Sequence, residues 1–236
     1  MDYRRFLPNL CTSMNLVFGM CSILATYSGS FFWGSLFILL ALVADGLDGR
    51  TARFFGVASE MGKEMDSLCD LGSFGIAPAF LAWSLVLHQY GLLGVAVVII
   101  FAVCGMWRLA RFNVNASVVH GYFMGLAIPA GGNIVAMSTL LFTQIGFDIA
   151  RLGLAYPIIM AVVGYLMISH VHYPNFKGDG GEPIYLVTKI AALVIFAAII
   201  WLGREAILPA IAIAVFGTYA IAGIINTLLA LFAKEG

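Results

Sequence analysis

Long apolar runs separated by short polar segments predict a bundle of membrane-spanning helices. A helix needs about 20 mostly apolar residues to cross the hydrocarbon core of a bilayer. Eight segments meet this measure: 8–28, 31–53, 66–88, 91–112, 121–145, 149–169, 184–203 and 206–232. The breaks between them are too short to hold a separate soluble domain. We therefore expect an all-α, polytopic membrane protein of about eight transmembrane helices, forming a single domain over residues 1–236.

The first apolar segment is expected to be a retained helix. Its basic start and apolar continuation resemble a signal peptide, but the run is too long and carries polar side chains. Three of these, Asn9, Thr12 and Asn15, recur at three-residue steps and so share one helix face. They could form hydrogen bonds with a substrate or with another helix.

Composition supports a membrane location and argues against a nucleic-acid partner. Hydrophobic residues make up 62% of the chain and charged residues only 10%, with a mean hydropathy of +1.00. Soluble domains are closer to half apolar and a quarter charged. Because the net charge is zero, no overall field favours nucleic acid.

The positions of the basic residues predict the orientation in the membrane. With eight spans and an internal N-terminus, ten of the 12 Lys and Arg residues fall on the inner side, as the positive-inside rule requires. Only Arg151 and Arg204 fall outside. We therefore expect a protein of the cytoplasmic membrane with both termini in the cytosol.

Acidic residues concentrate between Asp45 and Asp70. Four aspartates lie in these 26 positions, Asp45, Asp48, Asp66 and Asp70, and they make up a third of the 12 acidic residues of the chain. The first two are three residues apart and the last two are four apart. On helices, both spacings place the pair on one face, with Cβ atoms about 5–6 Å apart. The end of the second helix and the start of the third could then bring the two pairs together at the cytosolic surface.

Four converging carboxylates predict a site for hard divalent cations. They could remain ionised together only around cations, and oxygen ligands suit Mg²⁺, Mn²⁺ or Ca²⁺. No His lies among them, and Cys69, the one cysteine in this stretch, forms no CxxC and has no His at zinc spacing. Nearby, Gly49 and Gly62 allow a ligand to approach the backbone, and Arg53 offers a planar fork for phosphate. Metals, Arg and accessible backbone together indicate phosphoryl transfer.

The same stretch resembles the signature of the CDP-alcohol phosphotransferase family. The pattern D-x2-D-G-x2-A-R-x8-G-x3-D-x3-D is matched in full by Asp45, Asp48, Gly49, Ala52, Arg53, Gly62, Asp66 and Asp70. The resemblance implies two bound divalent cations, Mg²⁺ or Mn²⁺ with Ca²⁺ as a further option, held by Asp45, Asp48 and Asp66, with Asp70 joining one of them. Those cations would hold the pyrophosphate of a CDP-linked lipid.

The resemblance also implies roles for the other motif residues. Gly49, Arg53 and the hydroxyl of Ser59 would contact the nucleotide or its phosphates, within a binding region that also includes Ala52 and Gly62. Asp70 would act as the general base for the acceptor hydroxyl, which attacks the lipid-side phosphorus and releases CMP. A homodimer in the membrane lipid bilayer is the family expectation.

Further stretches resemble phosphatidylserine synthases of the integral-membrane type. They are PNLCTSMNLVFGMCSILA near the start, RLARFNV at 108–114, FMGLAIPAG at 123–131 and HYPNFK at 172–177. The resemblance covers most of the first 180 residues, which would form a six-helix core (about 1–180), followed by two additional helices (about 184–232). It implies CDP-diacylglycerol as donor and L-serine as acceptor.

Two arginines at the cytosolic end of the fourth segment are candidates for reading a substrate anion. Arg108 or Arg111 could pair with the serine carboxylate or with a phosphate oxygen, or could only anchor the helix end. Asn9 and Thr12 are further candidates for contact with serine or phosphate.

Other functions remain open at the level of sequence. The same chemistry could use inositol phosphate, glycerol phosphate or choline as acceptor, or an archaeal ether lipid in place of diacylglycerol. A divalent-cation transporter would favour acidic residues at mid-membrane on several helices, whereas here they cluster near one surface. A catalytically inactive scaffold is disfavoured by the complete signature.

Overall fold

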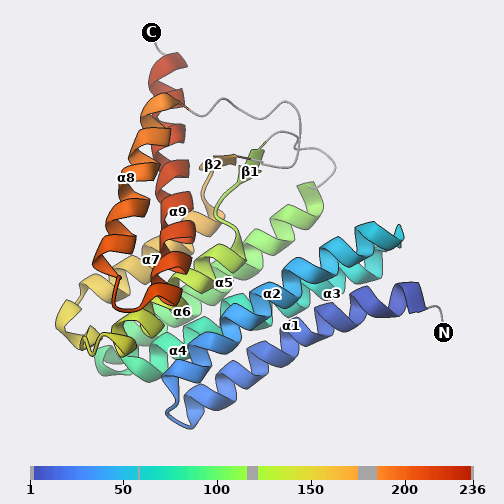
Figure 1. Ribbon diagram of the computed structural model, residues 1–236, viewed down its shortest axis with the longest axis horizontal. Coiled ribbons are helices and arrows are strands. Elements are labelled where there is room, and N and C mark those ends of the chain that lie inside the picture. Colours follow the sequence, from blue (N-terminus) through green and yellow to red (C-terminus); the bar gives the residue numbers. More distant parts are fainter. Residues whose placement is uncertain (1–2, 58, 116–121, 175–184, 235–236) are drawn as a thin grey trace.

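The computed structural model describes residues 3–57, 59–115, 122–174 and 185–234, and these form a helical bundle with one small two-stranded sheet (Figure 1). Two breaks between the predicted segments, at 113–120 and 170–183, are described only in part. Lys177, at the end of the HYPNFK stretch, lies outside the described residues. The helices are α1 (Tyr3–Tyr27), α2 (Phe31–Phe55), α3 (Glu60–Asp70), α4 (Ala77–Leu85), α5 (Gly91–Asn115), α6 (Ile128–Gln144), α7 (Ala155–Ile168), α8 (Leu186–Leu202) and α9 (Ile207–Lys234).

One of the predicted membrane helices is built from three consecutive helical pieces. A π-helical turn, η1 (Leu71–Ile76), joins α3 to α4 without a break, so that Glu60–Leu85 forms one rod. Counted in this way, the described ranges contain eight helical rods, which confirms the predicted all-α membrane bundle. Five rods are long and apolar enough to span a bilayer alone, whereas α6, α7 and α8 have only 17, 14 and 17 residues.

The boundaries of three predicted segments are wrong. The third rod begins at Glu60 rather than at residue 66, because Ser59 accepts a hydrogen bond from the Gly62 N–H and caps the helix earlier. The fifth predicted segment, 121–145, starts with a strand, and its helix begins only at Ile128. The sixth, 149–169, is divided into a short 3₁₀ turn, η3 (Ile149–Leu152), and α7.

The structure contains a two-stranded antiparallel sheet that the sequence does not predict. Strand β1 (Tyr122–Met124) pairs antiparallel with β2 (His172–Pro174), with Phe123 opposite Tyr173. The Tyr173 side chain is fully buried, and its ring centroid lies 4.9 Å from that of Tyr219 on α9. Helix α9 therefore packs directly against the two-stranded sheet.

The first three rods lie side by side and carry the acidic residues (Figure 1). Helix α2 ends at Gly56, whose φ of 62° suits glycine and whose N–H bonds to the carbonyls of Ala52 and Arg53. This cap turns the chain directly into α3. Close packing fixes α1 against the π-helical turn, because a Cβ on Gly19 would lie 2.9 Å from the Ser73 Cα.

Candidate active site

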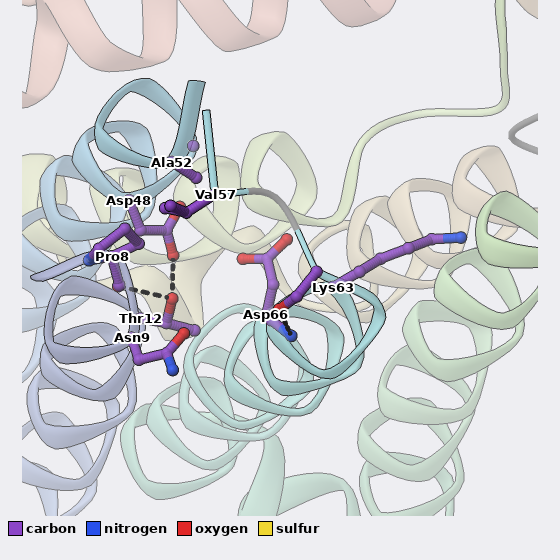
Figure 2. Close-up of a pocket in the computed structure, with 11 residues that line it drawn as sticks. Pro8, Asn9, Thr12, Asp48, Ala52, Val57, Lys63 and Asp66 are labelled. Carbon is purple, nitrogen blue, oxygen red and sulfur yellow. Dashed lines mark hydrogen bonds between the residues drawn. The ribbon is translucent and has the colours of Figure 1, made fainter. Parts of the chain in front are cut away.

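Three of the four aspartates form a compact carboxylate cluster. Asp45, Asp48 and Asp66 each offer an oxygen, and these atoms all lie within 4.8 Å of one another. Asp45 and Asp48 come from the last turns of α2, and Asp66 comes from α3, as the spacing predicts. The Asp48 and Asp66 carboxylates face one another across a pocket (Figure 2).

The chemistry of this cluster suits divalent cations. Asp48 is only 6% exposed, and the buried Oδ1 of Asp66 has no hydrogen-bond partner among the described residues. Neighbouring carboxylates in a water-poor place repel one another strongly. Three carboxylates, one of which has a buried oxygen without a hydrogen-bond partner among the described residues, could coordinate a hard cation.

Asp70 lies one helical turn beyond Asp66 and is not part of the three-carboxylate cluster. It is 7% exposed, and its Oδ1 accepts a hydrogen bond of 3.0 Å from the Asn15 amide on α1. The backbone carbonyl of Asn15 in turn accepts from the Ser73 hydroxyl at 2.9 Å. Asp70 directly precedes the π-helical turn that contains Ser73, a feature that is frequent at functional sites. Its carboxylate is thus held separately from the other three.

Helix α1 supports the acidic residues from one side. The Thr12 hydroxyl lies 2.7 Å from Asp48 Oδ2 and 3.1 Å from the Pro8 carbonyl, and the shorter contact is to the carboxylate (Figure 2). Thr12 and Asn15 therefore each bond one aspartate from a different helix. The three-residue step predicts that these residues share a face, but it does not identify the aspartates as their partners.

A pocket of about 180 Å³ opens beside the cluster. It is lined by most of the predicted nucleotide-binding residues and by part of α1: Pro8, Asn9, Thr12, Asp48, Gly49, Ala52, Val57, Ser59, Gly62, Lys63 and Asp66. Arg53 does not line it. Its exposed guanidinium lies over Gly49, where an added Cβ would be 3.5 Å from Arg53 Nη1.

Two residues of the pocket, Ser59 and Lys63, have settings that the sequence does not predict. Ser59 is the N-cap of α3 rather than a loop hydroxyl, and its oxygen already accepts from the Gly62 N–H at 3.1 Å. Lys63 is a lining residue that the sequence reasoning did not select. Its side chain extends away from Asp66, and its ammonium donates to the Asn113 carbonyl at 3.1 Å (Figure 2). The signal for Lys63 was its position between two motif residues.

The structure separates the two candidate arginines. Arg111 donates to four carbonyls, those of Ile168, Met124, Met167 and Ser169, at 2.7–3.1 Å. These hydrogen bonds connect α5 to the end of α7 and to strand β1. Arg108 is 8% exposed, and its buried Nε has no hydrogen-bond partner among the described residues.

Comparison with known proteins agrees with this arrangement. A sequence model described as CDP-alcohol phosphatidyltransferase matches residues 5–167. The chain is 35% identical to a CDP-diacylglycerol–serine O-phosphatidyltransferase of Helicobacter pylori, over 94% of this chain and 90% of the relative. It is 31% identical to the Bacillus subtilis protein of the same name, over 75% of this chain and 94% of the relative.

An archaeal relative with a different name has a comparable identity over a shorter part of the chain. The chain is 37% identical to an archaetidylserine synthase of Methanothermobacter thermautotrophicus, over 75% of this chain and 72% of the relative. The family match covers the whole stretch from Asp45 to Asp70 and most of the described helices. This membrane protein therefore belongs to the CDP-alcohol phosphatidyltransferase family of transferases.

Proposed function

We propose that this protein is a CDP-diacylglycerol–serine O-phosphatidyltransferase, which transfers a phosphatidyl group to L-serine and releases CMP. The observation that carries the chemistry is the cluster of Asp45, Asp48 and Asp66 within 4.8 Å, with Asp70 one turn away. Serine as the acceptor is supported by the relatives, since the names of both the bacterial and the archaeal proteins contain it.

We assign the metal-holding role to the carboxylate cluster. Asp45, Asp48 and Asp66 would hold two divalent cations, Mg²⁺ or Mn²⁺ with Ca²⁺ as a further option, and Asp70 would join one of them. Bound divalent cations supply positive charge that stabilises the charge developing on the attacked phosphate and on the leaving CMP. Thr12 would keep the Asp48 carboxylate in place, as partners of metal ligands do elsewhere.

Asp70 is assigned as the general base. Its carboxylate would take the proton from the serine hydroxyl as that oxygen attacks the lipid-side phosphorus. The bond from this phosphorus to the bridging oxygen of CMP breaks in the same displacement, and the proton remains on Asp70. Asn15 restricts the Asp70 carboxylate through one hydrogen bond, which leaves the second oxygen for the proton transfer.

The pocket beside the cluster is assigned to the CDP group. Gly49, Ala52 and Gly62 present little side chain there, so phosphate oxygens can reach the backbone. Arg53 at the rim is free to turn toward a phosphate because it is exposed. The Ser59 hydroxyl caps α3 and can still donate its own proton to an acceptor on the nucleotide. Asn9 adds a polar side chain from α1.

Arg108, rather than Arg111, is assigned to a substrate anion. The Arg111 guanidinium already donates to four carbonyls, whereas the buried Nε of Arg108 has no hydrogen-bond partner within the described part of the chain. The anion could be a phosphate oxygen of the lipid or the serine carboxylate.

We further propose a site that faces the cytosol, in a homodimer in the cytoplasmic membrane. Eight membrane-crossing rods, an even number, would put both ends of the described chain on one side of the membrane. The acidic residues share this side with Arg50, Arg53 and Lys63, as the positive-inside rule favours. Water-soluble serine and the membrane-bound lipid could then meet at one surface.

The test is CMP release by the purified protein from CDP-diacylglycerol with a panel of alcohols. We expect release with L-serine, and little with glycerol phosphate, inositol phosphate or choline. Release with one of the other alcohols and none with serine would reject the assigned acceptor. Because an archaetidylserine synthase is among the relatives, the ether-linked CDP-lipid belongs in the same panel as an alternative donor.

A further inference from the structure

A second cavity lies where α9 packs against α6, over Arg108 of α5. Its volume is about 310 Å³, within the lower range of ligand pockets. Apolar side chains form its walls apart from Arg108 and Tyr219; the others are Ala127, Pro129, Ala130, Val215 and Phe216. Three of these seven residues come from α9, which lies outside the family match at 5–167.

The buried cation in this cavity points to an anionic ligand. Arg108 is 8% exposed, and its Nε is buried with no partner among the described residues, although its guanidinium lies 5.1 Å from the Phe112 ring. A buried charge without a hydrogen-bonded partner is costly. A bound anion would satisfy it with charge-assisted hydrogen bonds. Arg108 lies on α5, which packs against the π-helical turn that directly follows Asp70, so this cavity adjoins the helix that carries the catalytic site.

The lining identifies which part of the substrates fits. Among the described residues that line the cavity, none is acidic, so nothing there would pair with the ammonium of serine. The apolar walls would instead accept hydrocarbon. Val215 is 48% exposed, so the cavity reaches the outer surface of α9, which an integral membrane protein presents to lipid. An anion joined to a hydrocarbon chain matches both features.

We propose that this cavity binds the lipid-side phosphate of the CDP-linked lipid together with the nearest part of one hydrocarbon chain. Arg108 pairs with the phosphate, and Ala130, Val215 and Phe216 contact the chain. This inference rests on the proposed function, and it assigns Arg108 to the lipid phosphate rather than to the serine carboxylate. It also makes α9 a determinant of lipid selectivity, positioned by the contact between Tyr219 and the buried Tyr173.

The experiment measures KM for the CDP-lipid and for serine separately, by CMP release from purified protein in detergent. The variants are Arg108→Gln, Ala130→Leu and Val215→Trp, and Ala96→Leu on the exposed face of α5 is the matched control. The donors are CDP-dipalmitoylglycerol and the short-chain CDP-dibutyrylglycerol. A chain-length dependence would not arise from a general loss of structure.

We expect Arg108→Gln to raise KM for both CDP-lipids about ten-fold with KM for serine unchanged, and Arg108→Lys to restore part of the loss. Ala130→Leu and Val215→Trp should raise KM about ten-fold for the long-chain donor only. Ala96→Leu should behave as wild type. Because Val215 is exposed, its variant keeps the test valid if Ala130→Leu does not fold.

Three outcomes would overturn the inference. A rise in KM for serine in Arg108→Gln would assign this arginine to the carboxylate. Equal effects on both chain lengths would remove the hydrocarbon from the cavity. Unchanged KM values in Val215→Trp, with loss of the dimer in light scattering, would show that a second copy of the chain, rather than the lipid, covers the opening of the cavity. Absence of wild-type turnover with any CDP-lipid and serine would instead reject the proposed function, and this inference with it.

Discussion

Replacing Thr12 with valine should weaken activation by the divalent cation about 10- to 100-fold. The Thr12 hydroxyl lies 2.7 Å from Asp48 Oδ2, and Thr12 is only 4% exposed, so water cannot easily replace it. Valine keeps the branched shape and removes the donor. A hydrogen bond to a charged group contributes about 1.5–3 kcal/mol, and about 1.4 kcal/mol corresponds to a factor of ten. Loss of an outer partner of a metal ligand has a similar cost.

The assay is a Mg²⁺ and Mn²⁺ titration of CMP release, which gives the cation concentration for half-maximal activity. Ser13→Ala is the matched control, because Ser13 is exposed on the same helix and its hydroxyl bonds, among the described residues, to the Asn9 carbonyl one turn earlier. Thr12→Val should shift the half-maximal concentration upward, and Ser13→Ala should not. An unchanged concentration in Thr12→Val would refute the idea that α1 positions a metal-holding carboxylate.

Three further predictions test other parts of the site. Asp70→Asn should retain binding of the CDP-lipid and lower turnover at least 100-fold, because the general base is lost; near-normal turnover would exclude that role. Ser59→Ala should cost about 1 kcal/mol of stability in thermal melting, because the Gly62 N–H loses its acceptor; an unchanged melting temperature would mean that the cap is dispensable. Arg111→Gln should lower the melting temperature, since four carbonyls lose a charged donor; a raised KM for serine at an unchanged melting temperature would contradict its structural role.

The rods of the bundle could be predicted because each is a long apolar run. Hydrophobicity alone defines such segments, and α2 (Phe31–Phe55) matches its predicted span of 31–53 closely. The two-stranded sheet could not be predicted in this way. Its strands are three residues long and about 50 residues apart, and both lie at the edges of apolar segments. Only the folded chain brings them together: the predicted helical segment 121–145 covers β1, and β2 falls in the predicted break after residue 169.

The candidate site shows the same division. The three- and four-residue spacings predict that Asp45 pairs with Asp48 and Asp66 with Asp70, because helix geometry decides this locally. The separation of Asp70 from the cluster depends on contacts with Asn15, which is 55 residues away in the chain. The distinct settings of Arg108 and Arg111 likewise depend on α7 and α9, and their sequence context is nearly the same.

The most direct test of this account follows labelled L-serine into lipid. Purified protein is mixed with CDP-diacylglycerol and labelled serine, with and without a divalent cation, and the organic phase and released CMP are both quantified. We expect one labelled lipid for each CMP released, and neither product without the cation. CMP release without label in the lipid, or labelled lipid formed after complete removal of divalent cations, would contradict it.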